Sequence, residues 1–168
     1  DGKNNSMGLG WQVIAAARTR EAGGDLAAMV ETAEQVRDRI SYHITLDTME
    51  YLSRGGRIGT ATKFLESIIK IKPVISVNPK TGSVAASLPA RSRQNAIEGI
   101  WREFFNHIDL NAPMHITVLH NAALEEARAI AERVKREYPA AEVFISITSP
   151  ILGVHTGPRA LALCGYSL

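Results

Sequence analysis

The stretch DTMEYLSRGGRIGTATKFLESIIKIKP, residues Asp47 to Pro73, decides how the rest of the chain is arranged. Thr48 to Ser53 is expected to form a short amphipathic helix, capped by Asp47 or Thr48. The sequence Arg54-Gly55-Gly56-Arg57 ends this helix, because two adjacent glycines stop a helix and permit positive φ. They also leave main-chain N–H groups unshielded beside two arginine side chains, so the pattern predicts a turn able to hold an anion.

A second helix is expected to begin near Thr60 or Thr62, and Pro73 turns the chain into a strand. Its broad apolar face contains Ala61, Phe64, Leu65, Ile68, Ile69 and Ile71. A polar turn beside an apolar helix suits a ligand with a charged head and an apolar body. From these residues alone a purely structural interpretation stays open, since most Gly-Gly turns and most apolar helix faces only connect and pack.

Composition places the chain among ordinary globular domains. Of its 168 residues 45% are hydrophobic and 21% are charged, and no apolar run approaches the roughly 20 residues of a membrane span. The net charge of +2 is too small to argue for nucleic acid or an anionic membrane. The first ten residues lack the pattern of a signal peptide and Cys164 is the only cysteine, which favours a cytoplasmic location.

Outward from the central stretch, periodicity predicts helices and strands in alternation. Residues 1–41 are expected to form a helical hairpin, with Ser6 and Asp25 as caps. Strands are expected at residues 42–46, 74–77, 83–88, 114–119, 142–148 and 160–166, helices at 92–107, capped by Ser92, and at 124–137, and a loop at 149–154. The predicted fold is therefore α+β, a two-layer mixed β-sheet covered by helices and preceded by an N-terminal helical hairpin.

A second candidate site lies at Gly153 to Pro158. His155 and Thr156 follow a strand and a loop, and Gly157-Pro158 fixes a turn, so an imidazole, a hydroxyl and N–H groups can converge on one carboxylate. A histidine satisfied by neighbouring carbonyl groups is the alternative. The chain lacks the histidine spacing of metal sites, a Walker loop and a nucleophile elbow, so no cofactor, metal or catalytic residue is expected.

Three motifs link these stretches to a known family. The run D-T-x-E-Y-L-x-R-G-G-R-I, followed by I-x-K-P-V-I, is accompanied by S-M-G-L-G-W-Q-V at residues 6–13 and G-x-H-T-G-P at residues 153–158. Together they resemble the C-terminal part of the DegV family of bacterial fatty-acid-binding proteins. The resemblance implies that residues 1–41 would pack on a missing N-terminal domain and that residues 42–168 form the C-terminal α/β domain that covers the lipid.

The resemblance also implies a function. The complete protein would hold a long-chain fatty acid and present its carboxylate to the ATP-binding subunit of a fatty acid kinase, which makes the acyl phosphate, so this chain would be a carrier and not an enzyme. The expected ligand-binding residues are His155, Thr156, Gly157, Arg57, Gly55, Gly56, Phe64 and Ile68. Arg57 and Arg91 correspond to basic positions that serve phosphoryl transfer or kinase docking. Arg159 stands where the family usually has Gly, and either adds a second cation or blocks the backbone shape of the turn.

Three other functions stay open. The chain is alternatively an enzyme for a small phosphorylated or carboxylated molecule, with His155 as general base near Arg57. It is alternatively an RNA-binding module through the Arg54–Arg57 turn, although Trp101, Phe104 and Phe105 lie on a core-type helix face where they cannot stack on bases. It is alternatively a structural fragment without activity. A hairpin deprived of its docking surface would also favour a homodimer.

Overall fold

The computed structural model describes residues 1–60, 71–139 and 141–168. In these ranges six strands form one sheet in the order β3-β2-β1-β6-β4-β5. The strands are β1 Ser41–Thr45, β2 Lys72–Val77, β3 Val84–Ala90, β4 Met114–His120, β5 Glu142–Ile147 and β6 Leu161–Ser167. The helices are α1 Ser6–Glu21, α2 Leu26–Arg39, α3 Glu50–Arg54, α4 Arg93–Phe105, α5 Leu124–Glu137 and α6 Pro150–Thr156.

The sheet is mixed, as predicted. β4 and β5 are parallel and are joined by α5, whereas the other neighbouring pairs are antiparallel. The turn between β2 and β3 forms because the Asn78 side chain accepts hydrogen bonds from the N–H groups of Lys80 and Thr81, and Gly82 has a φ of 72°. The predicted α+β fold with an N-terminal helical hairpin is confirmed.

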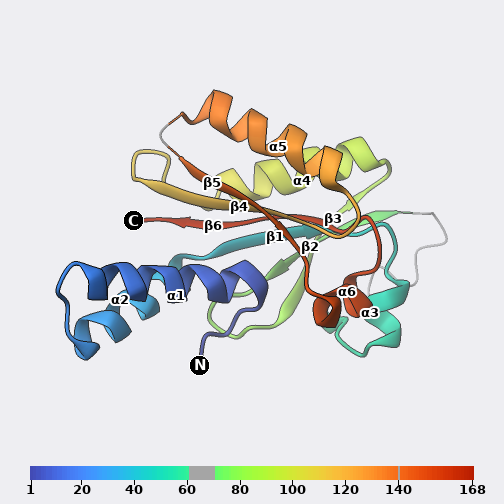
Figure 1. Ribbon diagram of the computed structural model, residues 1–168. Coiled ribbons are helices and arrows are strands. Elements are labelled where there is room, and N and C mark those ends of the chain that lie inside the picture. The colour runs from blue at the N-terminus through green and yellow to red at the C-terminus, as the bar shows by residue number, and fades with distance from the viewer. Residues whose placement is uncertain (61–70, 140) are drawn as a thin grey trace.

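The hairpin is part of the domain's packing. α1 and α2 lie on one face of the sheet, and α4 and α5 lie on the other (Figure 1). Trp11 of α1 is fully buried, and its ring stacks on Phe144 of β5 with the ring centroids 5.2 Å apart and lies 5.9 Å from that of Tyr166. Helices therefore cover both faces of the sheet. The sequence predicted that the hairpin precedes a two-layer domain, and the structure shows that it forms a further layer on the sheet.

The predicted helix caps of α2 and α4 are present. Asp25 accepts a hydrogen bond of 2.9 Å from the Ala28 N–H, and Ser92 accepts one of 3.1 Å from the Asn95 N–H. The prediction that Ser6 caps α1 is wrong, because α1 begins at Ser6 itself and the capping position belongs to Asn5, whose side chain makes no capping bond. Side-chain capping thus defines the start of α2 and α4 but not of α1.

The aromatic residues of α4 belong to the core. Trp101, Phe104 and Phe105 are buried against β4, β6 and α5 together with Ile100 and Ile130. The ring centroids of Trp101 and Phe105 are 4.5 Å apart, and the Arg133 guanidinium covers the Trp101 ring at 3.8 Å. These three aromatic rings are therefore not available to stack on RNA bases.

Glu142, at the start of the edge strand β5, is expected to make stability depend on pH. Its carboxylate accepts hydrogen bonds of 2.9 and 2.7 Å from Arg18, and it lies 2.6 Å from His115 Nδ1. The Arg18 guanidinium, assisted by His115, lowers the pKa of the Glu142 carboxyl from 4.5 to about 2. A lowered carboxyl pKa stabilises the fold above the ordinary pKa, and this contribution is lost as the pH falls from 4.5 towards 2.

Glu142→Gln is therefore expected to lower the free energy of unfolding near neutral pH by about 1 kcal/mol, a value kept small because Arg18 is 45% exposed. The difference from the wild type should shrink at acidic pH, since the wild-type carboxyl is then protonated as well. Urea unfolding of the wild type and the variant, near neutral pH and at acidic pH, measures this difference in stability. If the difference were equal under the two conditions, Glu142 would act through packing and not through its charge.

Candidate functional site

α3 and α6 lie side by side at one end of the sheet (Figure 1). Gly55 directly follows α3, and a Cβ atom on it would overlap the imidazole ring of His155 in α6. Gly157 directly follows α6, and a Cβ atom on it would overlap the ring of Tyr51 in α3. The structure therefore brings together the two turns that the sequence marked separately, and each turn has a glycine where the other approaches it.

The segment 149–154 forms most of a helix, so its prediction as a loop is wrong. Ser149 occupies the N-terminal cap position of α6, Pro150 is its first residue, and Gly157 ends it with a φ of 71°. Proline suits the first helical position because its missing N–H has no helical partner and its φ is already helical. The Ser-Pro start and glycine end were the missed signals, since seven residues show too little periodicity.

α3 begins two residues later than predicted. Its capping position is Met49, whose side chain makes no capping bond, and the Thr48 hydroxyl group accepts a hydrogen bond of 3.2 Å from the Glu50 N–H. The Asp47 carboxylate accepts a hydrogen bond of 2.6 Å from Lys72 Nζ. This ammonium group lowers the pKa of the Asp47 carboxyl. Asp47 thus joins the end of β1 to the start of β2, so of the two predicted caps only Thr48 bonds to the start of α3.

The glycine turn does not offer free main-chain N–H groups, contrary to the sequence-based interpretation. The N–H groups of Gly55, Gly56 and Arg57 donate to the carbonyl groups of Tyr51, Ser53 and Leu52 at 3.0 to 3.1 Å. These bonds continue α3 into a tight C-terminal turn, which uses the donors. The glycines contribute small size and, at Gly56, a φ of 66°.

Two polar side chains of α6 lie at this junction. His155 Nδ1 is buried and has no hydrogen-bond partner among the described residues. Thr156 is buried, and its hydroxyl group donates to the Leu152 carbonyl at 3.2 Å. An imidazole N–H can donate to a carboxylate in a charge-assisted bond, so His155 is the side chain of α6 best suited to bind an anion.

The arginine side chains occupy different places. Arg57 is exposed and donates to the Gly55 carbonyl at 3.0 Å, so it folds back over the glycine turn. Arg91 is exposed after β3, beside a pocket of about 430 Å³ that Pro89 and Asn95 also line. The structure thus places Arg57 at the paired turns and Arg91 on a separate part of the same sheet end. Phe64 and Ile68, with most of the predicted second helix, lie outside the described residues.

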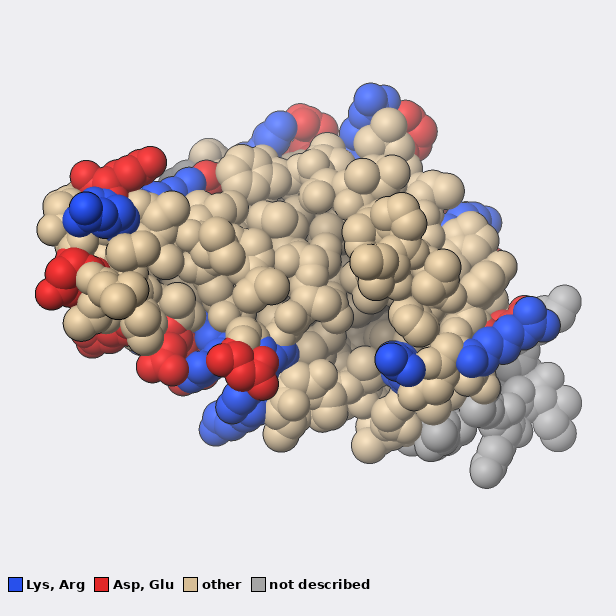
Figure 2. Space-filling model, turned by 60° about the horizontal axis from the view of Figure 1, so that its bottom comes forward, with Lys and Arg blue, Asp and Glu red and all other residues tan. Residues whose placement is uncertain are grey.

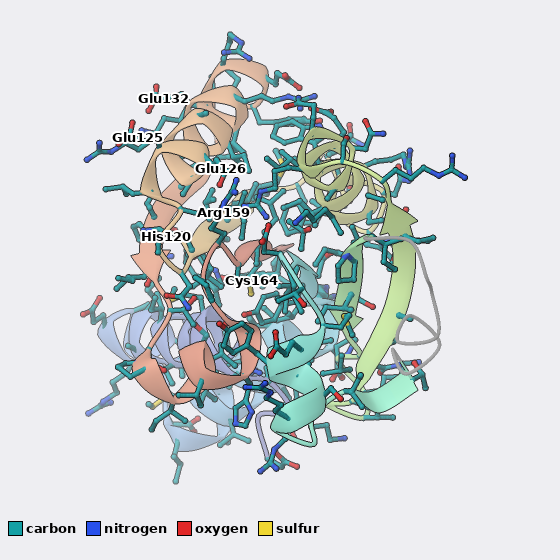
Figure 3. All side chains as sticks on the ribbon, turned by 90° about the vertical axis from the view of Figure 1, so that its right-hand side faces the viewer. His120, Glu125, Glu126, Glu132, Arg159 and Cys164 are labelled. Carbon is teal, nitrogen blue, oxygen red and sulfur yellow. The ribbon has the colours of Figure 1, made fainter. Side chains whose placement is uncertain are left out.

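Arg159 keeps the backbone shape that usually requires glycine. Its φ is 60°, and its N–H donates to the Asn121 carbonyl at 2.6 Å. Its guanidinium lies 3.7 Å from Glu126, which already accepts two bonds of 2.9 Å from Arg93. Figure 3 shows Arg159 and Glu126 together on the α5 side of the sheet end. The turn is therefore not blocked, and the added cation is directed to Glu126.

Arg159→Gly is expected to stabilise the fold by about 0.5–1 kcal/mol, because a side chain in left-handed conformation is strained and glycine is not. Arg159→Ala removes the charge but retains the strain, so it should not stabilise. Urea unfolding of both variants separates the two effects. Equal stability of the glycine and alanine variants would show that the strain at this position is negligible.

No group of three or more metal-ligating side chains occurs in the part of the chain that the structure describes. Over the same residues, none of the helices is long and apolar enough to cross a membrane.

Comparison with known proteins agrees with this architecture. The family model described as "Uncharacterised protein, DegV family" matches residues 1–167. The chain belongs to the DegV family, as the three motifs predicted. A DegV domain-containing protein of Streptomyces coelicolor is 34% identical over 159 residues, which cover 94% of this chain and 56% of that protein.

Solved structures of the family show the same fold. A DegV family protein from Thermus thermophilus, described for its fatty acid binding, has a TM-score of 0.92 and 28% identity over all of this chain and 60% of its own. DegV of Bacillus subtilis, described as a fatty acid binding protein, has a TM-score of 0.85 and 25% identity over 98% of this chain and 58% of its own. The chain thus spans 56–60% of the length of these three relatives.

Proposed function

We propose that this chain is part of a fatty-acid carrier. The carboxylate of the lipid would bind where the glycine turn after α3 meets the C-terminal end of α6. The observation that carries the proposal is the contact between Gly55 and His155, which joins the two motifs in one place. Fatty acid binding by the relatives from Thermus thermophilus and Bacillus subtilis supports it.

The proposed head-group chemistry rests on side chains. Because the main-chain N–H groups of the glycine turn are already bonded, His155 supplies the donor to the carboxylate and Arg57 supplies positive charge at the rim. Thr156 joins them if its hydroxyl group turns away from the Leu152 carbonyl. Gly157 and Gly55 allow the close approach of α3 and α6 that places these groups together.

The exposed side of the hairpin is proposed to pack against a further domain, as the longer relatives suggest. α1 and α2 form an apolar groove of about 460 Å³, lined by Leu9, Val13 and Val30 among others, and these three side chains are 44–61% exposed. Figure 2 shows a broad uncharged area across this face. An exposed apolar surface of this kind marks an interaction site.

Without that domain, two copies of this chain would pair through the groove. A strictly monomeric species in light scattering at high concentration would contradict this pairing.

The complete protein is proposed to present the carboxylate to a fatty acid kinase, with Arg57 and Arg91 at the contact. Arginine suits this task because its planar guanidinium holds phosphate with two hydrogen bonds. Arg91→Ala is expected to slow acyl phosphate formation by a kinase subunit while the amount of bound lipid stays unchanged. Loss of the lipid in this variant would instead assign Arg91 to the binding site.

Native mass spectrometry of the chain purified from a bacterial host tests the lipid proposal, followed by organic extraction of any bound mass. A stoichiometric fatty acid is expected in the wild type and should be lost in His155→Ala. His107→Ala is the matched control, because His107 is exposed at the C-terminal end of α4, which contacts Ser41 at the start of β1, whereas α3 follows the end of β1. An empty wild-type chain would contradict the proposal for this chain.

A further inference from the structure

Asn121 is tied to the turn that follows α6 by three hydrogen bonds. Its main-chain N–H donates to the Ala160 carbonyl at 2.9 Å, and its carbonyl accepts from the Arg159 N–H at 2.6 Å. Its side-chain Nδ2 donates to the Gly157 carbonyl at 2.7 Å. Asn121 directly follows β4, which is paired with β6 on one side and β5 on the other, so the sheet holds the turn through this residue.

The Nδ2 bond acts on the carbonyl group of a residue with an unusual backbone conformation. Gly157 has a φ of 71° and a ψ of 177°, which only glycine adopts readily. The Tyr51 ring fills the space next to its Cα atom, and Asn121 holds its carbonyl group. Gly157, which follows His155 and Thr156, is therefore held by Tyr51 on one side and by Asn121 on the other.

We infer that Asn121 is a positioning residue for the carboxylate-binding turn, through the hydrogen bond from its side chain to Gly157. This inference rests on the proposed function. Asn121 does not contact the carboxylate itself. It fixes the direction in which the chain leaves α6 and with it the orientation of His155 and Thr156.

Asn121→Asp isolates the side-chain bond. The two main-chain bonds remain in any variant, and aspartate has the same shape as asparagine, so packing beneath α6 is kept. A Cβ atom on Gly153 would lie 3.3 Å from Nδ2, which shows how closely the amide fits there. Aspartate has no N–H to donate and places a carboxylate oxygen against the Gly157 carbonyl, so the turn should move. Asn106→Asp, at the exposed C-terminal end of α4, is the matched control.

The test compares palmitate with hexadecanol, which has the same chain and no carboxylate. Asn121→Asp is expected to weaken palmitate binding about tenfold and to change hexadecanol binding less than about twofold, because only the head group depends on the turn. Asn106→Asp should change neither affinity. Unchanged palmitate affinity, or equal losses for both ligands, would overturn the inference, because equal losses indicate a merely structural role.

A second measurement needs no ligand. In NMR spectra of the free chain, Asn121→Asp should shift the His155 ring and the Thr156 and Gly157 amide signals while the Trp101 indole signal stays in place. If the wild type binds neither palmitate nor hexadecanol, the proposed function fails and these shifts alone decide the role of Asn121. Unshifted His155, Thr156 and Gly157 signals would overturn it.

Discussion

Gly55→Ala is expected to abolish tight fatty acid binding while the chain stays folded. The backbone at Gly55 has a φ of −79° and a ψ of −5°, which alanine adopts without strain. The new Cβ atom would overlap Nδ1 and Cε1 of His155, so the ring must leave its place. Loss of the charge-assisted bond from His155 should cost about 1.5–3 kcal/mol of binding free energy.

Palmitate affinity and the NMR signals of the His155 ring measure this effect. Gly56→Ala is the control for backbone strain in the same turn, because Gly56 has a φ of 66° and a Cβ atom on it would meet no atom within 4 Å. It should cost about 1–2 kcal/mol of stability and leave the His155 ring in place. Wild-type affinity and an unshifted ring in Gly55→Ala would show that His155 does not bind the carboxylate from this position.

Trp11→Ala is expected to lower the free energy of unfolding by about 3–5 kcal/mol, the usual cost of removing a fully buried aromatic side chain. Trp11 joins α1 to the sheet through its stacking on Phe144 and its contact with Tyr166. The ring lies 5.6 Å from that of His115, beside the Arg18–Glu142 ion pair. Its removal therefore opens a cavity between the hairpin and the sheet.

Urea unfolding measures this loss, and Val13→Ala in the same helix is the control. Val13 is 61% exposed, so its truncation should change stability by less than about 0.5 kcal/mol. If the two variants lost equal stability, the hairpin would not be part of the domain's cooperative core. If instead Trp11→Ala unfolded in two separate transitions, α1 and α2 would be a unit of their own.

Periodicity predicted the helices and strands that bury one regular face. α5 matches its expected range, and α4 ends two residues before the predicted end at residue 107. Ile100 and Phe104 recur at helical spacing in α4, as do Ala127 and Ile130 in α5, and all face the core. The short α6 was missed, since a seven-residue helix next to the site depends on Ser149, Pro150 and Gly157 and not on a long apolar stripe.

The candidate site was predicted in its parts but not in its assembly. The two turns were both marked, yet the contact of Gly55 with His155 depends on how α3 and α6 pack. The free main-chain donors expected at Gly55-Gly56 are bonded within the turn, a result of local helix geometry that a Gly-Gly pattern cannot specify. Asn121 gave no signal, because its partner Gly157 is 36 residues away.

The most direct test of the proposed site is an NMR experiment with carbon-13-labelled palmitate bound to the chain. We expect contacts between the C2 methylene group of the lipid and the His155 ring protons, together with a shift of the Gly157 amide signal. Contacts of the same methylene group with Leu9, Val13 or Val30 in the hairpin groove, and none with His155, would contradict it.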